Sequence, residues 1–232
     1  MNPTRKIATV AGVFFIVTEV AAIAGLALYD PVLNSPDYII GSGADTRVFL
    51  GALSEVILAI AVIGTGVTLF PILRRQNEGV ALGYVCGRLL EAAVIVVGII
   101  SVLSVVTLRQ DLAGAANADA VSLVAVGKSL VAIHEWTFLF GPNYALGANT
   151  LLLAYLMDRS ALAPRFIAVL GLVGGMMIFV SATAVMFGLY EQVSVWGSIA
   201  AVPVFAWEVT LAVRLIAKGF KPSPWIRVVD LI

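Results

Sequence analysis

The sequence predicts an all-α protein, a polytopic transmembrane bundle of six helices forming one domain over residues 1–232. Three observations support this prediction. The chain is 61% hydrophobic and 12% charged, whereas soluble domains have about 45–50% apolar and about 25% charged residues. Its apolar residues gather in long runs, and its mean hydropathy is +1.04. Its lysines and arginines gather in loops on one side of the expected membrane, as they do in multi-pass proteins.

Each of six apolar runs is long enough to cross a hydrocarbon core of about 30 Å. The expected spans cover residues 7–28, 48–70, 80–108, 121–156, 166–189 and 193–217. The first run follows Arg5 and Lys6 and contains Ala22-Ile23-Ala24, which is similar to a signal-peptide cleavage site. Because this run is longer than the usual core of about 7–15 residues and is interrupted by Glu19, we expect a retained helix.

The fourth run is longer than one straight span requires, and Gly141-Pro142 lies inside it. Proline lacks an N–H, and its ring clashes with the carbonyl four residues earlier, here that of Phe138. Residues 143–156 alone are short for a span, so we predict one long helix that is broken at Gly141-Pro142. A simple proline kink and a functional break are both compatible with this pattern.

The loop charges predict that both termini are cytoplasmic, in a plasma (inner) membrane. The side of the N-terminus carries ten basic residues and the other side two, which is a positive-inside bias. The ten are Arg5, Lys6, Arg74, Arg75, Arg159, Arg165, Arg214, Lys218, Lys221 and Arg227, and the two are Arg47 and Arg109. Seven spans would place the basic tail on the opposite side, which also favours six.

Composition argues against nucleic-acid binding. The formal net charge is zero, so the chain has no basic footprint for nucleic acid.

The single cysteine, Cys86, lies in an apolar run, and we interpret it as a small packing residue. Glycines four residues apart, at Gly83 and Gly87 and again at Gly171 and Gly175, allow close approach of helices in lipid.

Charged residues inside the spans are the candidates for a ligand- or ion-binding site. An ionised side chain at the bilayer centre costs at least about 2.5–3.5 kcal/mol on insertion scales, so each one needs a reason. The candidates are Glu19, Glu55, Arg88, Glu91, His134, Glu135 and Glu208. At about 1.5 Å rise per residue, the glutamates of the first, second, third and sixth spans are expected near one midplane layer, with Glu135 further out.

The balance of these charges is negative. Five glutamates against Arg88 and Lys128 leave a surplus of three negative charges while His134 is neutral. A low-dielectric interior does not hold such a surplus bare. Protonation of some glutamates, a bound cation or a cationic ligand would neutralise it.

The preferred hypothesis is a polar site that binds or moves a proton, a cation or a small polar ligand. Glu91 would be its central acid, oriented by Arg88 three residues away, and the break at Gly141-Pro142 would be its flexible element. One alternative is a structural or partner-binding membrane module, in which the charges only lock the helices together. The lipid bilayer is the one partner that the sequence identifies.

A second alternative is an intramembrane enzyme, which the residues favour less. The chain has one histidine and no HExxH or GxSxG motif, although zinc hydrolases and serine hydrolases commonly use these motifs. A mixed metal site from Glu91, His134 and Glu208 stays open. No pattern identifies a metal or a cofactor.

Several segments together resemble a known family. They are Arg88-Leu89-Leu90-Glu91, the segment from Phe138-Leu139-Phe140-Gly141-Pro142 through 147–153 to Pro164-Arg165, and Trp207-Glu208 with Lys218-Gly219-Phe220. The resemblance spans nearly the whole chain and is to an uncharacterised family of bacterial integral-membrane proteins, a domain of unknown function. It implies six helices in a bacterial inner membrane and no particular activity.

Overall fold

The structure, a computed structural model, describes residues 2–35, 38–41, 43–112 and 120–223, and it is helical throughout these ranges apart from short connections. The helices are α1 (Pro3–Leu33), α2 (Asp45–Leu73), α3 (Glu78–Leu112), α4 (Ala120–Leu139), the π-helical segment η1 (Phe140–Ala145), α5 (Leu146–Ser160), α6 (Arg165–Met186) and α7 (Val195–Lys218). Within the described ranges, six helical paths are long and apolar enough to cross a membrane. The predicted six-helix transmembrane fold is confirmed.

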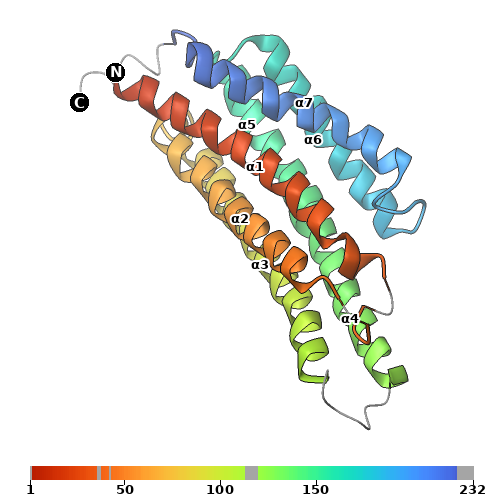
Figure 1. Ribbon diagram of the computed structural model, residues 1–232. Helices are drawn as coiled ribbons and strands as arrows, with labels where there is room; N and C mark the ends of the chain where they lie inside the picture. Colours follow the sequence, from red (N-terminus) through yellow and green to blue (C-terminus); the bar gives the residue numbers. More distant parts are fainter. Residues whose placement is uncertain (1, 36–37, 42, 113–119, 224–232) are drawn as a thin grey trace.

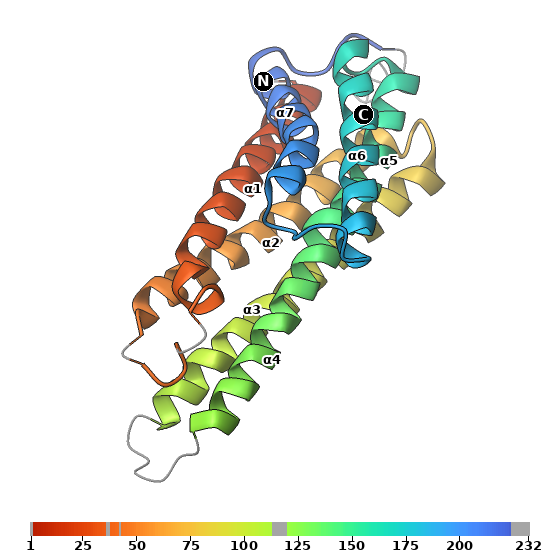
Figure 2. The same cartoon turned by 90° about the vertical axis from the view of Figure 1, so that its right-hand side faces the viewer.

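The bundle has two unequal halves along its length. The start of α1 and the end of α7 lie at one end, which we call the proximal end, and α3 and α4 reach furthest toward the opposite, distal end (Figure 1). A view turned by 90° shows α6 and α7 beside the proximal half only (Figure 2). The proximal core draws buried residues from α1, α2, α3, α5, α6 and α7. The distal core draws its buried residues from α1, α2, α3 and the α1–α2 connection, with partly buried residues of α4 packed against it.

The fourth helical path changes its hydrogen-bonding pattern, from α-helical to π-helical and back, between α4 and α5. It is built from α4, η1 and α5, so the interruption predicted at Gly141-Pro142 is confirmed. Pro142 has no N–H to give to the Phe138 carbonyl. The side-chain amide of Asn143 donates to that oxygen instead, at 3.0 Å. The chain therefore widens into π turns here and resumes as α5, without leaving the carbonyl unpaired.

The N-terminal helix is tied to the last helix at the proximal end. The Arg5 guanidinium donates to the carbonyls of Leu215, Ile216 and Ala217, at 3.0, 2.6 and 3.1 Å. The last carbonyls of a helix have no partner within the helix, and a cation at that end interacts well with the helix dipole. Arg5 thus caps the C-terminus of α7.

Two details differ from the sequence expectation. The fifth path ends at Met186 rather than at residue 189, because Gly188 takes a left-handed conformation with φ +73°. The sixth path begins at Val195 rather than at residue 193. Cys86, expected to pack between helices, is instead exposed on α3. Arg227, which contributed to the predicted charge bias, lies outside the described residues.

Candidate functional site

Arg88 lies at the centre of the proximal half, 1% exposed on α3. Its Nη1 donates to both carboxylate oxygens of Glu91, at 3.3 and 3.1 Å. Its Nη2 donates to Glu208 Oε1 on α7 at 3.0 Å, and its Nε donates to the Tyr84 hydroxyl at 3.3 Å. All three guanidinium nitrogens therefore have partners, and one arginine joins α3 to α7.

Aromatic rings enclose the same guanidinium. Its central carbon lies 5.7 Å from the ring centre of Phe15 on α1 and 5.5 Å from that of Tyr84 on α3. A cation over an aromatic face is favourable, more so when it is desolvated. Trp207 packs edge-on against Phe15 at 6.2 Å and is itself fully buried. These rings hold Arg88 in a single place.

Glu91 has a further partner from the fourth helical path. The Asn149 amide on α5 donates to Glu91 Oε2 at 2.8 Å. Asn149 is 1% exposed and its side chain lies against Gly87, where a methyl group would collide with it. Gly141 in η1 also lies close to α3, because a methyl group there would be 3.5 Å from the Glu91 carbonyl oxygen. The π-helical segment thus adjoins the charged centre.

A third carboxyl, that of Glu19 on α1, completes this centre. It is half-buried, and Glu208 and Arg88 are its charged neighbours. We call Glu19, Arg88, Glu91, Asn149 and Glu208 the arginine layer. This layer holds three carboxyls and one guanidinium. The guanidinium nitrogens donate hydrogen bonds to Glu91, Glu208 and the Tyr84 hydroxyl.

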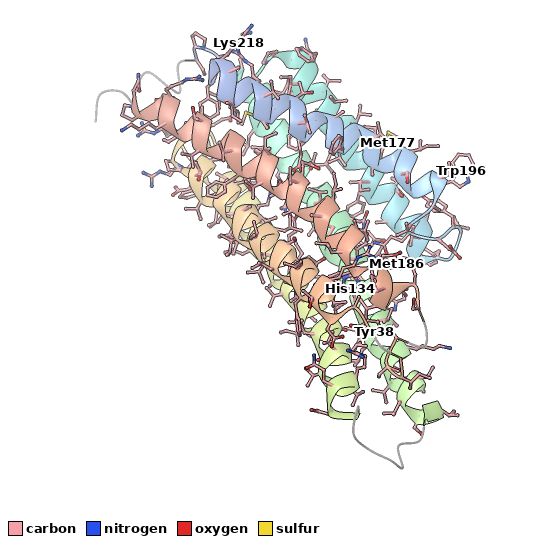
Figure 3. All side chains as sticks on the ribbon, viewed as in Figure 1. Tyr38, His134, Met177, Met186, Trp196 and Lys218 are labelled. Carbon is pink, nitrogen blue, oxygen red and sulfur yellow. The ribbon has the colours of Figure 1, made fainter. Side chains whose placement is uncertain are left out.

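A second polar group lies in the distal half, around His134 (Figure 3). His134 Nε2 on α4 lies 3.8 Å from Glu55 Oε1 on α2. The imidazole also meets the Tyr29 ring edge-on at 5.4 Å, and all three residues are buried. The Tyr29 hydroxyl has no hydrogen-bond partner among the described residues. We call Glu55, His134 and Tyr29 the histidine layer.

Small residues create the space for the histidine layer. A methyl group on Gly25 of α1 would lie 2.9 Å from the Cγ of Glu55, and one on Gly51 of α2 would lie 2.7 Å from the Tyr29 ring. One on Gly98 of α3 would lie 3.4 Å from the His134 ring. Gly25 is six residues beyond Glu19, and Gly98 is seven beyond Glu91. At 1.5 Å per residue, the two layers are therefore about 10 Å apart along the bundle.

The predicted site residues thus fall into three places. Glu19, Arg88, Glu91 and Glu208 come together in the arginine layer, and Glu55 and His134 meet in the histidine layer. Glu135 joins neither, because it is exposed on α4 and points about 100° away from His134 on the helix. The possible metal set of Glu91, His134 and Glu208 is not brought together. Over the described ranges, no group of three His, Cys, Asp or Glu side chains is placed to hold a metal.

Sequence reasoning overlooked two tyrosines in these layers. Tyr84 lies one helical turn before Arg88, and this spacing of four residues on a helix was the available signal. Tyr29 had no such signal, since its neighbours Glu55 and His134 come from other helices. The structure also brings in Asn149, whose amide donates to Glu91.

A surface ion pair secures the connection between α1 and α2 at the distal end. Arg109 on α3 donates to both carboxylate oxygens of Asp45, at 2.9 Å for the Nε bond, and to the Gly41 carbonyl at 2.8 Å. The Tyr38 hydroxyl donates to Asp45 at 2.7 Å. Burial raises the pKa of the Tyr38 hydroxyl, and its bond to Asp45 raises it further. Tyr38 therefore stays a donor at physiological pH.

These features define a class of protein: a multi-pass α-helical membrane protein with a buried, acid-rich polar centre. The chain matches the family model described as "Domain of unknown function (DUF4386)" over residues 10–219, and it belongs to that family. The match includes both layers. No curated protein and no solved structure matches the chain.

Proposed function

We propose that this protein takes up and releases a proton at the arginine layer and functions as a proton-linked membrane carrier. The observation that carries the proposal is the ratio of charges in that layer. Three buried or half-buried carboxyls share one guanidinium, which leaves two negative charges if all are ionised. Such a surplus is unfavourable in a low-dielectric interior unless protons or cations compensate for it.

Glu19 is the carboxyl proposed to exchange its proton. Glu91 and Glu208 accept hydrogen bonds from Arg88, so the guanidinium is committed to these two carboxyls. Glu19 lies beside Glu208 rather than in this bonded set, and it is only half-buried. A proton held between Glu19 and Glu208 would convert a repulsive pair of carboxylates into a hydrogen-bonded pair.

The π-helical segment supports a moving part. π-helical turns inside α-helices are frequent at functional sites. Here η1 lies between the distal α4 and the proximal α5, and α5 carries the Asn149 amide that is bonded to Glu91. A change in the turns at η1 would shift Asn149 relative to Glu91, which links the geometry of the fourth helical path to the charge of the layer.

A structural module is the second candidate, and the complete bonding of Arg88 favours it. An arginine whose every nitrogen is paired can lock helices without binding anything further. The two candidates differ in whether the proton in the layer exchanges. A lock keeps its protonation state across the physiological pH range, whereas a carrier changes it.

The orientation belongs to the proposal as well. We place the proximal end in the cytoplasm, because Arg5, Arg74, Arg165 and Lys218 lie at or near helix ends there and basic loops are retained on that side. Protons would then enter the histidine layer from the distal side and reach the arginine layer about 10 Å further in.

Infrared spectroscopy of the purified protein in lipid tests the proposal. A buried protonated carboxyl gives a carbonyl stretching band, which should appear and disappear as the pH is varied. Glu19→Gln should remove that change, and Glu78→Gln, at the exposed start of α3, is the matched control. A spectrum that is unchanged with pH would favour the structural module, and a change that survives both Glu19→Gln and Glu208→Gln would overturn the assignment of the proton to these two carboxyls.

A further inference from the structure

A cavity of about 370 Å³ lies in the distal half, and none of the residues that line it belongs to either polar layer. It is bounded by the end of α1, the first residues after it, α3 and the distal part of α4. Its volume falls at the lower end of the range for small-molecule sites, about 300–1,000 Å³. It is therefore large enough for a small organic molecule and too large for a single ion.

Aliphatic side chains form part of the walls of this cavity. Val32, Leu33, Val105 and Val131 contribute them, and Ile39 closes one side by packing on Gly127. The packing is close, because a methyl group on Gly127 would lie 3.1 Å from Ile39 Cδ1. Such walls suit the apolar body of a ligand and leave its specificity to a few polar groups.

Two charged side chains of opposite sign line the cavity, both from α4. They are Lys128 and Glu135, seven residues apart and so on nearly the same face of the helix. Both are exposed, and neither has an ion pair within the described residues. Their separation along α4 is about 10 Å between backbone positions, so the cavity has a cationic end and an anionic end.

The other polar groups nearby are already committed. The Tyr38 hydroxyl donates to Asp45, and the Asn34 amide donates to Asp30 at 2.8 Å. Arg109 is neutralised by Asp45. Among the described residues that line the cavity, the charged side chains are thus Lys128 and Glu135, with aliphatic side chains between them.

We propose that this cavity binds a small zwitterion, with its anionic group at Lys128, its cationic group at Glu135 and its aliphatic body on the wall between them. The complement of a site with one charge of each sign is a molecule with one charge of each sign, since a singly charged ligand would leave one end without a partner. Amino acids with separated charges belong to this class, and zwitterionic lipid headgroups share its chemistry. The inference does not depend on proton uptake at the arginine layer.

Thermal unfolding of the purified full-length protein tests this site, because a ligand that binds the folded state raises the unfolding temperature. The soluble probes are glycine, β-alanine and longer ω-amino acids, each compared with the alkylamine and the carboxylate of the same length. The lipid probe is phosphatidylethanolamine, added to the delipidated protein. We expect stabilisation by zwitterions and none by the singly charged analogues. Whether the soluble or the lipid probe acts identifies the source of the ligand.

Substitutions then locate the binding. Lys128→Met and Glu135→Gln should each raise the dissociation constant about tenfold or more, as expected for loss of a charged hydrogen bond. The double exchange Lys128→Glu with Glu135→Lys should restore binding, with the ligand reversed. Glu191→Gln and Lys218→Met, which are exposed and are not part of the cavity lining, are the controls (Lys218 is labelled in Figure 3). If no zwitterion stabilises the protein, or if both single variants bind as well as the wild type, the inference is wrong.

Discussion

The two polar layers of this protein differ in how completely their charges are paired. In the proximal half, Arg88 has partners on every nitrogen, and the apolar core of that half draws on six helical paths. In the distal half, His134 and Glu55 stand 3.8 Å apart, and Tyr29 has a buried hydroxyl without a partner. A fully bonded ion cluster resists rearrangement, whereas a loosely paired one can change state at little cost. The comparison therefore contrasts a guanidinium that is fixed by its partners with two groups outside that bonded set, the Glu19 carboxyl and the histidine layer, whose contacts are looser.

The largest expected effect is the loss of the single cation in the arginine layer. Arg88→Met leaves Glu91 and Glu208 buried without a counter-charge, which should cost about 3–5 kcal/mol of stability. Denaturant unfolding in mild detergent measures this loss. Adding Glu208→Gln and Glu91→Gln to Arg88→Met should recover part of it. A stable Arg88→Met protein would show that the carboxyls are already neutral.

The next largest loss of stability is expected at the close contact between α3 and α5. Gly87→Ala places a methyl group in collision with Asn149 and should cost about 1–3 kcal/mol, as overpacking does. Gly83→Ala, four residues away on the same helix, meets only a Leu152 carbon at 3.9 Å and should change stability by less than about 0.5 kcal/mol. Equal unfolding midpoints for the two variants would contradict the packing described.

A smaller effect is expected in the histidine layer. Glu55→Gln removes a contact of 3.8 Å with His134, which is too long for a hydrogen bond. The variant should therefore lose less than about 1 kcal/mol, while Glu91→Gln loses more because Arg88 and Asn149 both bond to that carboxylate. Parallel unfolding curves of the two variants measure the difference. The reverse order would overturn the contrast between the layers.

The smallest effect concerns the distal surface. Tyr38→Phe removes the hydrogen bond to Asp45 and leaves the ion pair of Asp45 with Arg109 intact. We expect a loss of about 1 kcal/mol or less, seen as faster limited proteolysis between α1 and α2. Asp45→Asn should accelerate cleavage further, because it weakens every contact of that cluster. Unchanged cleavage in both variants would show that other contacts hold the connection.

The sequence predicted the helices well because run length and proline chemistry are local properties. The six spans follow from apolar runs, and the interruption at Pro142 follows from its missing N–H. The depth of Glu19, Glu91 and Glu208 could be counted from the ends of their runs. Glu55 was expected in the same layer, but this counting treats all helices as starting at one level. The structure shows α3 and α4 extending well past α6 and α7 (Figure 2).

Contacts between helices could not be predicted in this way. The pairing of Glu55 with His134 and the isolation of Glu135 depend on how α4 is rotated about its axis, which one sequence does not specify. The bond from Asn149 to Glu91 depends on the π turns of η1, because one additional residue in a turn rotates everything that follows it. The enclosure of the Arg88 guanidinium depends on Phe15 from another helix, α1, as well as on Tyr84 from its own.

The caps and ion pairs that join α1 and α3 to α7 have a consequence for biosynthesis. Arg5 and Arg88 emerge from the ribosome among the first hundred residues, yet their partners Leu215 and Glu208 are among the last to be made. Until α7 enters the membrane, Arg88 has only Glu91 and Tyr84 from its own helix. A chain that stops before α7 therefore leaves Arg88 Nη2 without its acceptor and Arg5 without the carbonyls that it caps, which are features that distinguish it from the finished protein.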